Sequence, residues 1–129
     1  MESKVILVAD DIALVRKGTV ATVQCFGFET DEAEDGFEVL EKARVSAYSA
    51  ILMDIHMPGL NGLECTERIR ELEVGRSVRT PIIGFTSEEI CPEIREACFR
   101  AGMDDCLNKD CRVDVLQKTL SKWSLGAAS

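Results

Sequence analysis

Segments that suit short buried strands alternate with segments of helical periodicity along this chain, and this alternation limits the possible folds more than any other feature. Three of the strand segments are apolar runs that end at charged or turn-forming residues, over residues 5–9, 50–54 and 81–85. Such runs predict strands buried on both faces, which occur in parallel sheets covered by helices. Weaker patterns predict two further strands, over residues 28–33 and 103–107.

The segments between the strands carry apolar or small residues at three- and four-residue steps, as amphipathic helices do. The first helix is expected to start at Leu14, with Asp11 near its N-cap, and Gly27 is expected to close it. The residues that carry the periodicity of this helix are Leu14, Val15, Gly18, Ala21, Thr22 and Cys25.

Turn-forming residues separate the later elements. The pair Asp35-Gly36 is expected to form a turn ahead of a short helix that ends near Arg44. The last helix is expected to end at Trp123, and residues 124–129 are expected to form a frayed tail. Two more helices are expected between these, one after Gly62 and one with Pro92 in its first turn.

Strand and helix therefore alternate five times, which predicts a parallel sheet with right-handed crossovers and helices on both faces. The predicted fold class is α/β: one doubly wound, flavodoxin-like (βα)5 domain with strand order 2-1-3-4-5. The domain is expected to occupy residues 1–129, with its core over about residues 4–123.

Composition excludes several classes of protein. At 129 residues and 46% hydrophobic content the chain can form a full core, but only 5% is aromatic, so aliphatic residues must fill it. The net charge of −8 argues against a nucleic-acid partner, because phosphate backbones repel an acidic surface. No apolar run is long enough for a membrane span or a leader, and a cytoplasmic location is expected. The six cysteines have no CxxC spacing and are expected to be reduced thiols.

Chemically active side chains follow four of the five strands. Because the carboxyl ends of parallel strands meet at one edge, these side chains are expected to converge on one crevice. Three crowded carboxylates need a cation, and oxygen ligands with room for water suit Mg²⁺, or Mn²⁺ in its place. An ammonium and a hydroxyl beside the metal would suit a phosphoryl group. The residues are Asp10, Asp11, Asp54, Thr86 and Lys109.

The motifs ILVADD, ILMDIHMPGLNG, PIIGFTSE and the Lys of CLNK resemble those of receiver domains in two-component response regulators, over almost the whole chain. The resemblance implies a signalling domain that catalyses only its own phosphorylation and dephosphorylation. Asp54 would accept the phosphoryl group, Thr86 would bond its oxygen and Lys109 would pair with it. Asp10, Asp11, Asp54 and the backbone carbonyl of His56 would hold Mg²⁺.

The resemblance also implies the partners. The donor would be a phosphohistidine on a histidine kinase or a histidine phosphotransfer protein, or a small donor such as acetyl phosphate. No nucleic-acid or membrane contact is expected of this domain, and a homodimer is left open. The stretches IIGFT and AGMDDCLNK are more similar to receivers of hybrid histidine kinases than to stand-alone regulators.

Two positions depart from the family pattern. Asp110 stands where a proline with a cis peptide bond is usual, so a trans bond or an altered loop is expected, and the loop should be more mobile. Cys106 replaces the aromatic residue that commonly acts as a rotameric switch. These departures keep a phosphorylation-independent pseudo-receiver open as an alternative. A haloacid-dehalogenase-type phosphatase is the other, although Ile55-His56 after Asp54 lacks its DxD signature.

Overall fold

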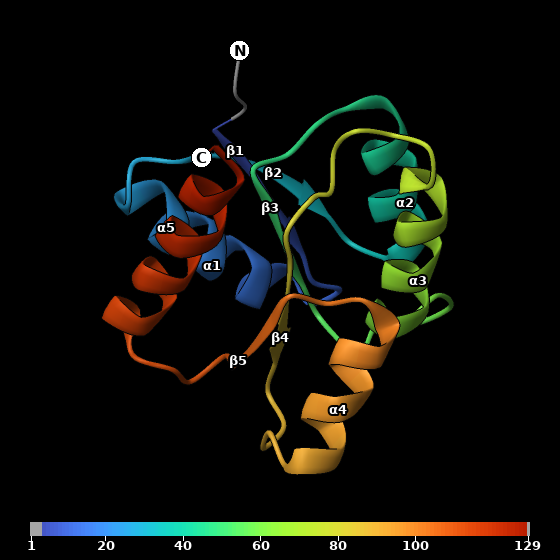
Figure 1. Cartoon of the computed structure of the whole chain (residues 1–129). Coiled ribbons are helices and arrows are strands. Elements are labelled where there is room, and N and C mark those ends of the chain that lie inside the picture. Colours follow the sequence, from blue (N-terminus) through green and yellow to red (C-terminus); the bar gives the residue numbers. More distant parts are fainter. Residues whose placement is uncertain (1–3, 129) are drawn as a thin grey trace.

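Five parallel strands form a single sheet in the order β2-β1-β3-β4-β5 in the computed structural model, which describes residues 4–128 (Figure 1). This is the predicted strand order, and the parallel pairing of every neighbouring pair confirms the predicted fold class. The bounds of the strands agree with the predicted ones to within two residues at each end. The strands are β1 Val5–Ala9, β2 Glu29–Ala33, β3 Ala50–Met53, β4 Ile82–Thr86 and β5 Asp105–Asn108.

Helices cover both faces of the sheet, as the alternating order requires. Helices α1 and α5 lie on one side, and α2, α3 and α4 lie on the other (Figure 1). Each crossover therefore returns the chain to the same end of the sheet, so all carboxyl ends of the strands share one edge. The helices are α1 Ala13–Cys25, α2 Gly36–Val45, α3 Gly62–Glu73, α4 Pro92–Ala101 and α5 Val113–Ala128.

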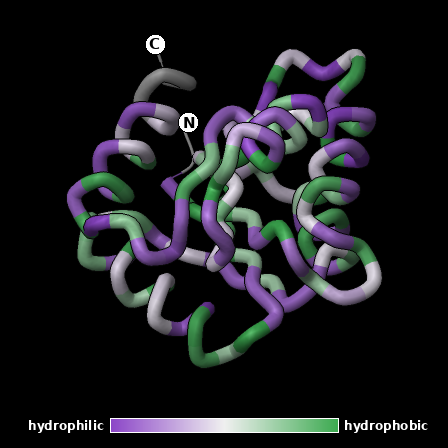
Figure 2. The backbone as a smooth tube through the Cα atoms, turned by 90° about the horizontal axis from the view of Figure 1, so that it is seen from below, coloured by the Kyte–Doolittle hydropathy of each residue, from purple (hydrophilic) through white to green (hydrophobic). Residues whose placement is uncertain are grey.

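The core has two apolar layers, one on each face of the sheet. The layer under α2, α3 and α4 contains Ile51, Met53 and Ile82, and the layer under α1 and α5 contains Leu52 and Ile83. Consecutive residues of β3 thus enter opposite layers, which is why the central strands are apolar throughout. Figure 2 shows hydrophobic and hydrophilic residues alternating along the helices, which expose one face to water. Aliphatic side chains dominate both layers, as the low aromatic content predicted.

The predicted turn before α2 needs correction. Asp35 and Gly36 do not form a separate turn: Asp35 is the N-cap of α2, its side chain accepts the Glu38 N–H, and Gly36 begins the helix. A side chain at Gly36 would collide with Leu60, which explains the glycine there. Asp11 lies next to the N-cap of α1, as expected, but the N-cap is Ile12 and no side chain caps the helix.

The buried face of α1 also differs from the predicted one. Leu14 is 85% exposed, and Ala21 and Cys25 are exposed as well, whereas Arg16, Val20 and Val23 face the sheet. The small and apolar residues of α1 recur at helical spacing on both faces, so periodicity alone did not identify the inner one. The buried arginine proves important for the site described below.

The carboxyl terminus is more regular than predicted. Helix α5 continues past Trp123 to Ala128, so the part of the expected frayed tail over residues 124–128 is wrong, while Ser129 lies outside the described residues. The segment Ser124–Ala128 contains no proline and continues the hydrogen-bonded helix, and Ser124 donates its hydroxyl to the Leu120 carbonyl. Trp123 lies against the layer under α1 and α5, and its indole N–H donates to Asp105.

Candidate functional site

Three carboxylates meet at the carboxyl edge of the sheet. One carboxylate oxygen each from Asp10, Asp11 and Asp54 lies within 4.8 Å of the others. Asp10 and Asp11 follow β1, and Asp54 follows β3, the strand paired with β1. Asp10 and Asp54 are buried, whereas Asp11 is exposed. The donors are all oxygen and one side opens to water, which is the environment that Mg²⁺ prefers.

Lys109 brings one positive charge to this cluster from the end of β5. Its Nζ lies 2.6 Å from Asp10 Oδ2 and 3.3 Å from Asp54 Oδ2. Its side chain is only 13% exposed, so water screens the interaction weakly. One ammonium cannot neutralise three carboxylates, and the cluster therefore keeps a net negative charge that a divalent cation would balance.

Asp54 lies at the centre of the cluster with little access to water. Burial raises the pKa of its carboxyl group and the nearby Asp10 raises it further, while Lys109 lowers it. The His56 N–H donates to Asp54 Oδ1 at 3.2 Å, which orients the carboxylate. Gly62 packs directly on the Asp54 carbonyl, where any side chain would collide with the backbone. The second glycine of the MPGLNG motif therefore holds the loop after β3 close to Asp54.

Thr86 ends β4 beside this cluster, and it is fully buried. Its Oγ1 accepts the Glu88 N–H at 3.2 Å, and its carbonyl accepts the Lys109 N–H at 2.8 Å. The His56 Nε2 atom lies 2.6 Å from Glu88 Oε1. The His56 side chain is 65% exposed, but this contact means that it is not a free surface side chain. Glu88 thus connects the loops after β3 and β4, a contact that the sequence argument missed.

The loop that carries Lys109 is held by its neighbour Asn108. The Asn108 side chain donates to the Glu88 carbonyl at 2.8 Å and accepts the Asp110 N–H at 2.7 Å. The described residues contain no cis peptide bond, so the bond before Asp110 is trans, as expected. Asp110 is exposed. Beside Asp54, Lys109 pairs with the carboxylate of Asp10.

Cys106 lies in the core rather than at the site surface. It packs beside Cys98 over Gly84, and both thiols are buried. Burial raises the pKa of Cys98 to about 12 and also raises that of Cys106, so neither is a reactive thiolate at neutral pH. All six cysteines are free thiols, as the sequence predicted.

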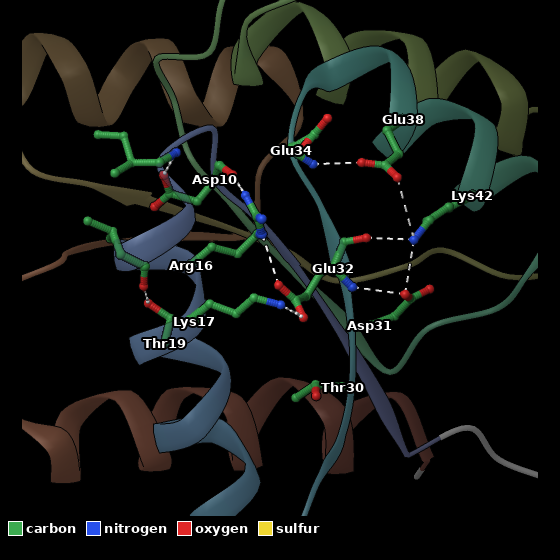
Figure 3. Close-up of polar contacts among 12 residues, drawn as sticks. Asp10, Arg16, Lys17, Thr19, Thr30, Asp31, Glu32, Glu34, Glu38 and Lys42 are labelled. Atoms are coloured by element: carbon green, nitrogen blue, oxygen red, sulfur yellow. Dashed lines mark hydrogen bonds and ion pairs between the residues drawn. The ribbon is translucent and has the colours of Figure 1, made fainter.

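Arg16 is the polar residue that the sequence argument overlooked. It occupies the buried face of α1, donates through one terminal nitrogen to the Asp10 carbonyl, and forms an ion pair with Glu32 (Figure 3). A charged residue inside an apolar periodicity would have been the available signal, because a buried arginine needs partners.

A family comparison decides what kind of domain holds this site. The model of the response regulator receiver domain matches residues 6–121. The chain belongs to the response regulator receiver domain family. The receiver motifs, ILVADD and ILMDIHMPGLNG among them, thus lie where the structure forms the acidic cluster.

The chain matches parts of much longer proteins, sensor histidine kinases among them. The chain is 31% identical over 123 residues to the sensor histidine kinase RcsC of Salmonella typhimurium, covering 95% of this chain and 12% of that protein. It is 37% identical over 120 residues to the hybrid signal transduction protein dokA of Dictyostelium discoideum, covering 93% of this chain and 7% of the relative. The chain thus spans a small part of the relatives that it matches.

Solved structures give the same fold. The receiver domain of sensor histidine kinase PA1611 from Pseudomonas aeruginosa, with a magnesium ion coordinated in its active site cleft, superposes with a TM-score of 0.83 at 34% identity, covering 95% of this chain and 98% of that one. The chemotaxis protein CheY4 of Vibrio cholerae gives 0.83 at 30% identity, covering 94% and 98%. Within residues 4–128, no helix has the length and apolarity to cross a membrane.

Proposed function

We propose that this receiver domain accepts a phosphoryl group on Asp54 in a Mg²⁺-dependent reaction and acts in a phosphorelay. The observation that carries the proposal is the excess of carboxylate over ammonium charge around a buried carboxylate that Lys109 already contacts. A structural ion-pair network would balance its charges. This arrangement instead suits a divalent cation together with the incoming phosphoryl oxygens.

The proposed residue roles follow from position and charge. Asp10, Asp11 and Asp54, with the His56 carbonyl, would hold Mg²⁺, which would neutralise phosphoryl oxygens and align the donor. Asp54 Oδ2 already faces Lys109, so Oδ1, which the His56 N–H orients, is the other oxygen available for the metal or for attack. Lys109 would exchange its contact with Asp10 for one with a phosphoryl oxygen as negative charge arrives beside Asp54.

Thr86 would respond to phosphorylation of Asp54 by changing the hydrogen bond of its hydroxyl. Its hydroxyl is buried and at present accepts the Glu88 N–H. A phosphoryl oxygen on Asp54 is a stronger acceptor than any neutral group, so the Thr86 O–H would rotate to donate to it. Because Glu88 also contacts His56 and Asn108, that rotation would disturb the loops after β3, β4 and β5 together.

The proposed partner is a phosphohistidine protein, either a histidine kinase or a histidine phosphotransfer protein. Beside the acidic cluster, Ile12 is 54% exposed and Leu14 is 85% exposed. Two neighbouring exposed aliphatic residues next to a site are suited to a helical partner. Ile12→Asp should slow transfer from the partner and leave labelling by acetyl phosphate unchanged, and equal loss of both would assign Ile12 to folding.

Intact-mass measurement after incubation with Mg²⁺ and acetyl phosphate tests the proposal. We expect one added phosphoryl group that hydroxylamine removes, no addition in EDTA, and none in Asp54→Asn. No labelling of the wild-type chain under any condition would favour the pseudo-receiver alternative. Sustained release of phosphate from a general phosphomonoester would favour the phosphatase alternative. Labelling of Asp54→Asn at the wild-type rate would refute the assignment of Asp54.

A further inference from the structure

Arg16 contacts the backbone of a metal-cluster residue from within the buried face of α1. Its side chain is 10% exposed, its terminal nitrogen donates to the Asp10 carbonyl at 2.8 Å, and its Nε donates to Glu32 Oε1 at 2.9 Å. The bond to Asp10 is buried, so water does not compete for the carbonyl. Figure 3 shows the guanidinium between the Asp10 backbone and β2.

The backbone from Asp10 to the start of α1 is restrained at its amides, and Lys109 holds one oxygen of the Asp10 carboxylate at 2.6 Å. Asp10 N–H donates to the Ala33 carbonyl, and Ile12 N–H donates to Asp10 Oδ1. The N-cap residue Ile12 provides no side-chain bond to the helix. The Asp10 carbonyl is therefore held by a side chain from the second turn of α1, and this bond limits rotation of the peptide that follows Asp10.

The far side of the guanidinium is held equally firmly. Glu32 accepts from Arg16 through one carboxylate oxygen and from Lys17 through the other, at 2.9 Å in each case. These hydrogen bonds, that of Lys17 first, lower the pKa of Glu32, which keeps it ionised at neutral pH. Glu32 lies on β2 in register with Val8 of β1. The Arg16 guanidinium therefore links β2 to the residue that follows the adjacent strand β1.

We infer that Arg16 is a positioning residue for the metal site: by holding the Asp10 carbonyl it fixes the direction of the Asp10 carboxylate. The inference needs only the acidic cluster and Mg²⁺, and it does not depend on phosphoryl transfer. Residues that orient metal ligands from behind commonly alter metal affinity about tenfold or more when they are removed.

The sign of the change in affinity separates positioning from simple electrostatics. Arg16 is a cation near a cation site, so charge alone predicts that its removal would tighten Mg²⁺ binding. Loss of positioning predicts weaker binding instead. Arg16→Lys retains the positive charge but loses the planar guanidinium that donates to two acceptors. Charge alone therefore predicts no change in Mg²⁺ affinity for this variant.

The test is Mg²⁺ titration of the full chain, followed by amide NMR and restricted to samples that are folded. We expect Arg16→Lys and Arg16→Met to bind Mg²⁺ about tenfold more weakly. Lys17→Met is the matched control: it removes the same charge from the same helix and the same partner, Glu32, but it does not contact Asp10. It should bind Mg²⁺ as tightly as the wild type or slightly more tightly.

A second readout needs no metal and covers the case in which Arg16→Met does not fold. In metal-free Arg16→Lys, the Ile12 amide, which donates to Asp10 Oδ1, should exchange with solvent faster than in Lys17→Met. If Arg16→Lys binds Mg²⁺ with wild-type affinity and Ile12 exchange is unchanged, Arg16 is only a structural ion pair and the inference is overturned. Equal weakening by Lys17→Met would likewise overturn it.

Discussion

The two ends of the sheet both contain charged side chains with little access to water, but they satisfy them differently. At the amino ends of β4 and β5, Arg70 donates to the Gly102 and Thr80 carbonyls and to the carboxylates of Glu73 and Asp104. At the carboxyl ends, Lys109 pairs with Asp10 and Asp54, two members of a cluster of three carboxylates. The first end has a partner for each charge, and the second end lacks a positive charge.

This difference separates a structural network from a binding site. Asp104 accepts from Arg70, from Arg79 and from the Ile82 N–H, so it fastens the chain at the start of β4 and needs no ligand. Burial raises the pKa of Asp54, which means that its charged form is disfavoured where it stands. The amino end is built for stability, and the carboxyl end retains unfavourable charge that a cation can relieve.

Removing the arginine at the structural end should give the largest change in stability. Arg70→Met leaves two nearly buried carboxylates without their main cation, so we expect the free energy of unfolding in urea to fall by about 3 kcal/mol. Mg²⁺ affinity should change less than about twofold, since the network is at the opposite end of the strands. Arg100→Met is the matched control, because Arg100 is 79% exposed and forms only a surface pair with Glu96.

Loss of Mg²⁺ affinity in Arg70→Met would break the comparison by showing that the two ends are coupled. A similar loss of stability in Arg100→Met would show that charge, rather than buried pairing, explains the effect. An exposed pair of this kind is expected to contribute no more than about 0.5 kcal/mol.

Removing an acid at the functional end should affect binding and spare the fold. Asp11 is exposed, and its carboxylate belongs to the cluster. Asp11→Ala should weaken Mg²⁺ binding about tenfold, equivalent to about 1.4 kcal/mol, and slow labelling by acetyl phosphate. The unfolding free energy without metal should be unchanged or slightly higher, because one repulsion is gone. NMR titration gives the affinity, and an unchanged titration would remove Asp11 from the site.

The raised pKa of Asp54 predicts how stability depends on pH. The carboxyl group of Asp54 has a higher pKa in the folded state than in the unfolded state, where the pKa is near 3.8. The free energy of unfolding therefore falls as the pH rises from 3.8 through the pKa of the folded state. Asp54→Asn avoids this loss and still offers an oxygen to the His56 N–H. Without metal at pH 7 it should be more stable than the wild type by about 1 kcal/mol, and the gap should close below pH 3.8.

Urea unfolding at both pH values, with and without Mg²⁺, measures this difference. Mg²⁺ should stabilise the wild type and not the variant. If Asp54→Asn is less stable than the wild type at pH 7, the attraction of Lys109 outweighs burial and the functional end holds no unfavourable charge.

The sequence predicted the strand order from the alternation of strand and helix together with the flavodoxin-like order, and it predicted the acidic cluster from the residues at the strand ends. Apolar runs placed β1, β3 and β4, and the residue after each run placed Asp10, Asp54 and Thr86 at one edge. The buried face of α1 was not predictable in this way, since apolar or small residues recur at helical spacing on both faces and only the completed fold shows that Val20, and not Leu14, is buried. Interactions between distant residues, such as Arg16 with Glu32 or His56 with Glu88, likewise have no local signature.

Asp110 gives the smallest expected effect, and it tests how the loop of Lys109 is held. The absence of a proline at this position led the sequence argument to expect a more mobile loop. The structure gives the Asp110 N–H an acceptor, Asn108 Oδ1 at 2.7 Å, so proline would remove a hydrogen bond while it restricts φ. The two effects oppose each other, and we now expect labelling of Asp110→Pro within about twofold of the wild type.

Two further variants separate the hydrogen bond from the charge. Asn108→Ala frees the Asp110 amide and leaves φ unrestricted, so this amide should exchange faster and labelling should slow about twofold. Asp110→Asn keeps the hydrogen bond and removes an exposed charge, so it should match the wild type. Hydrogen exchange at residue 110, measured beside the acetyl phosphate rate, distinguishes the explanations. A severalfold faster rate in Asp110→Pro would mean that the loop is mobile despite Asn108, and that Lys109 is less firmly held than its contacts with Asp10 and Asp54 indicate.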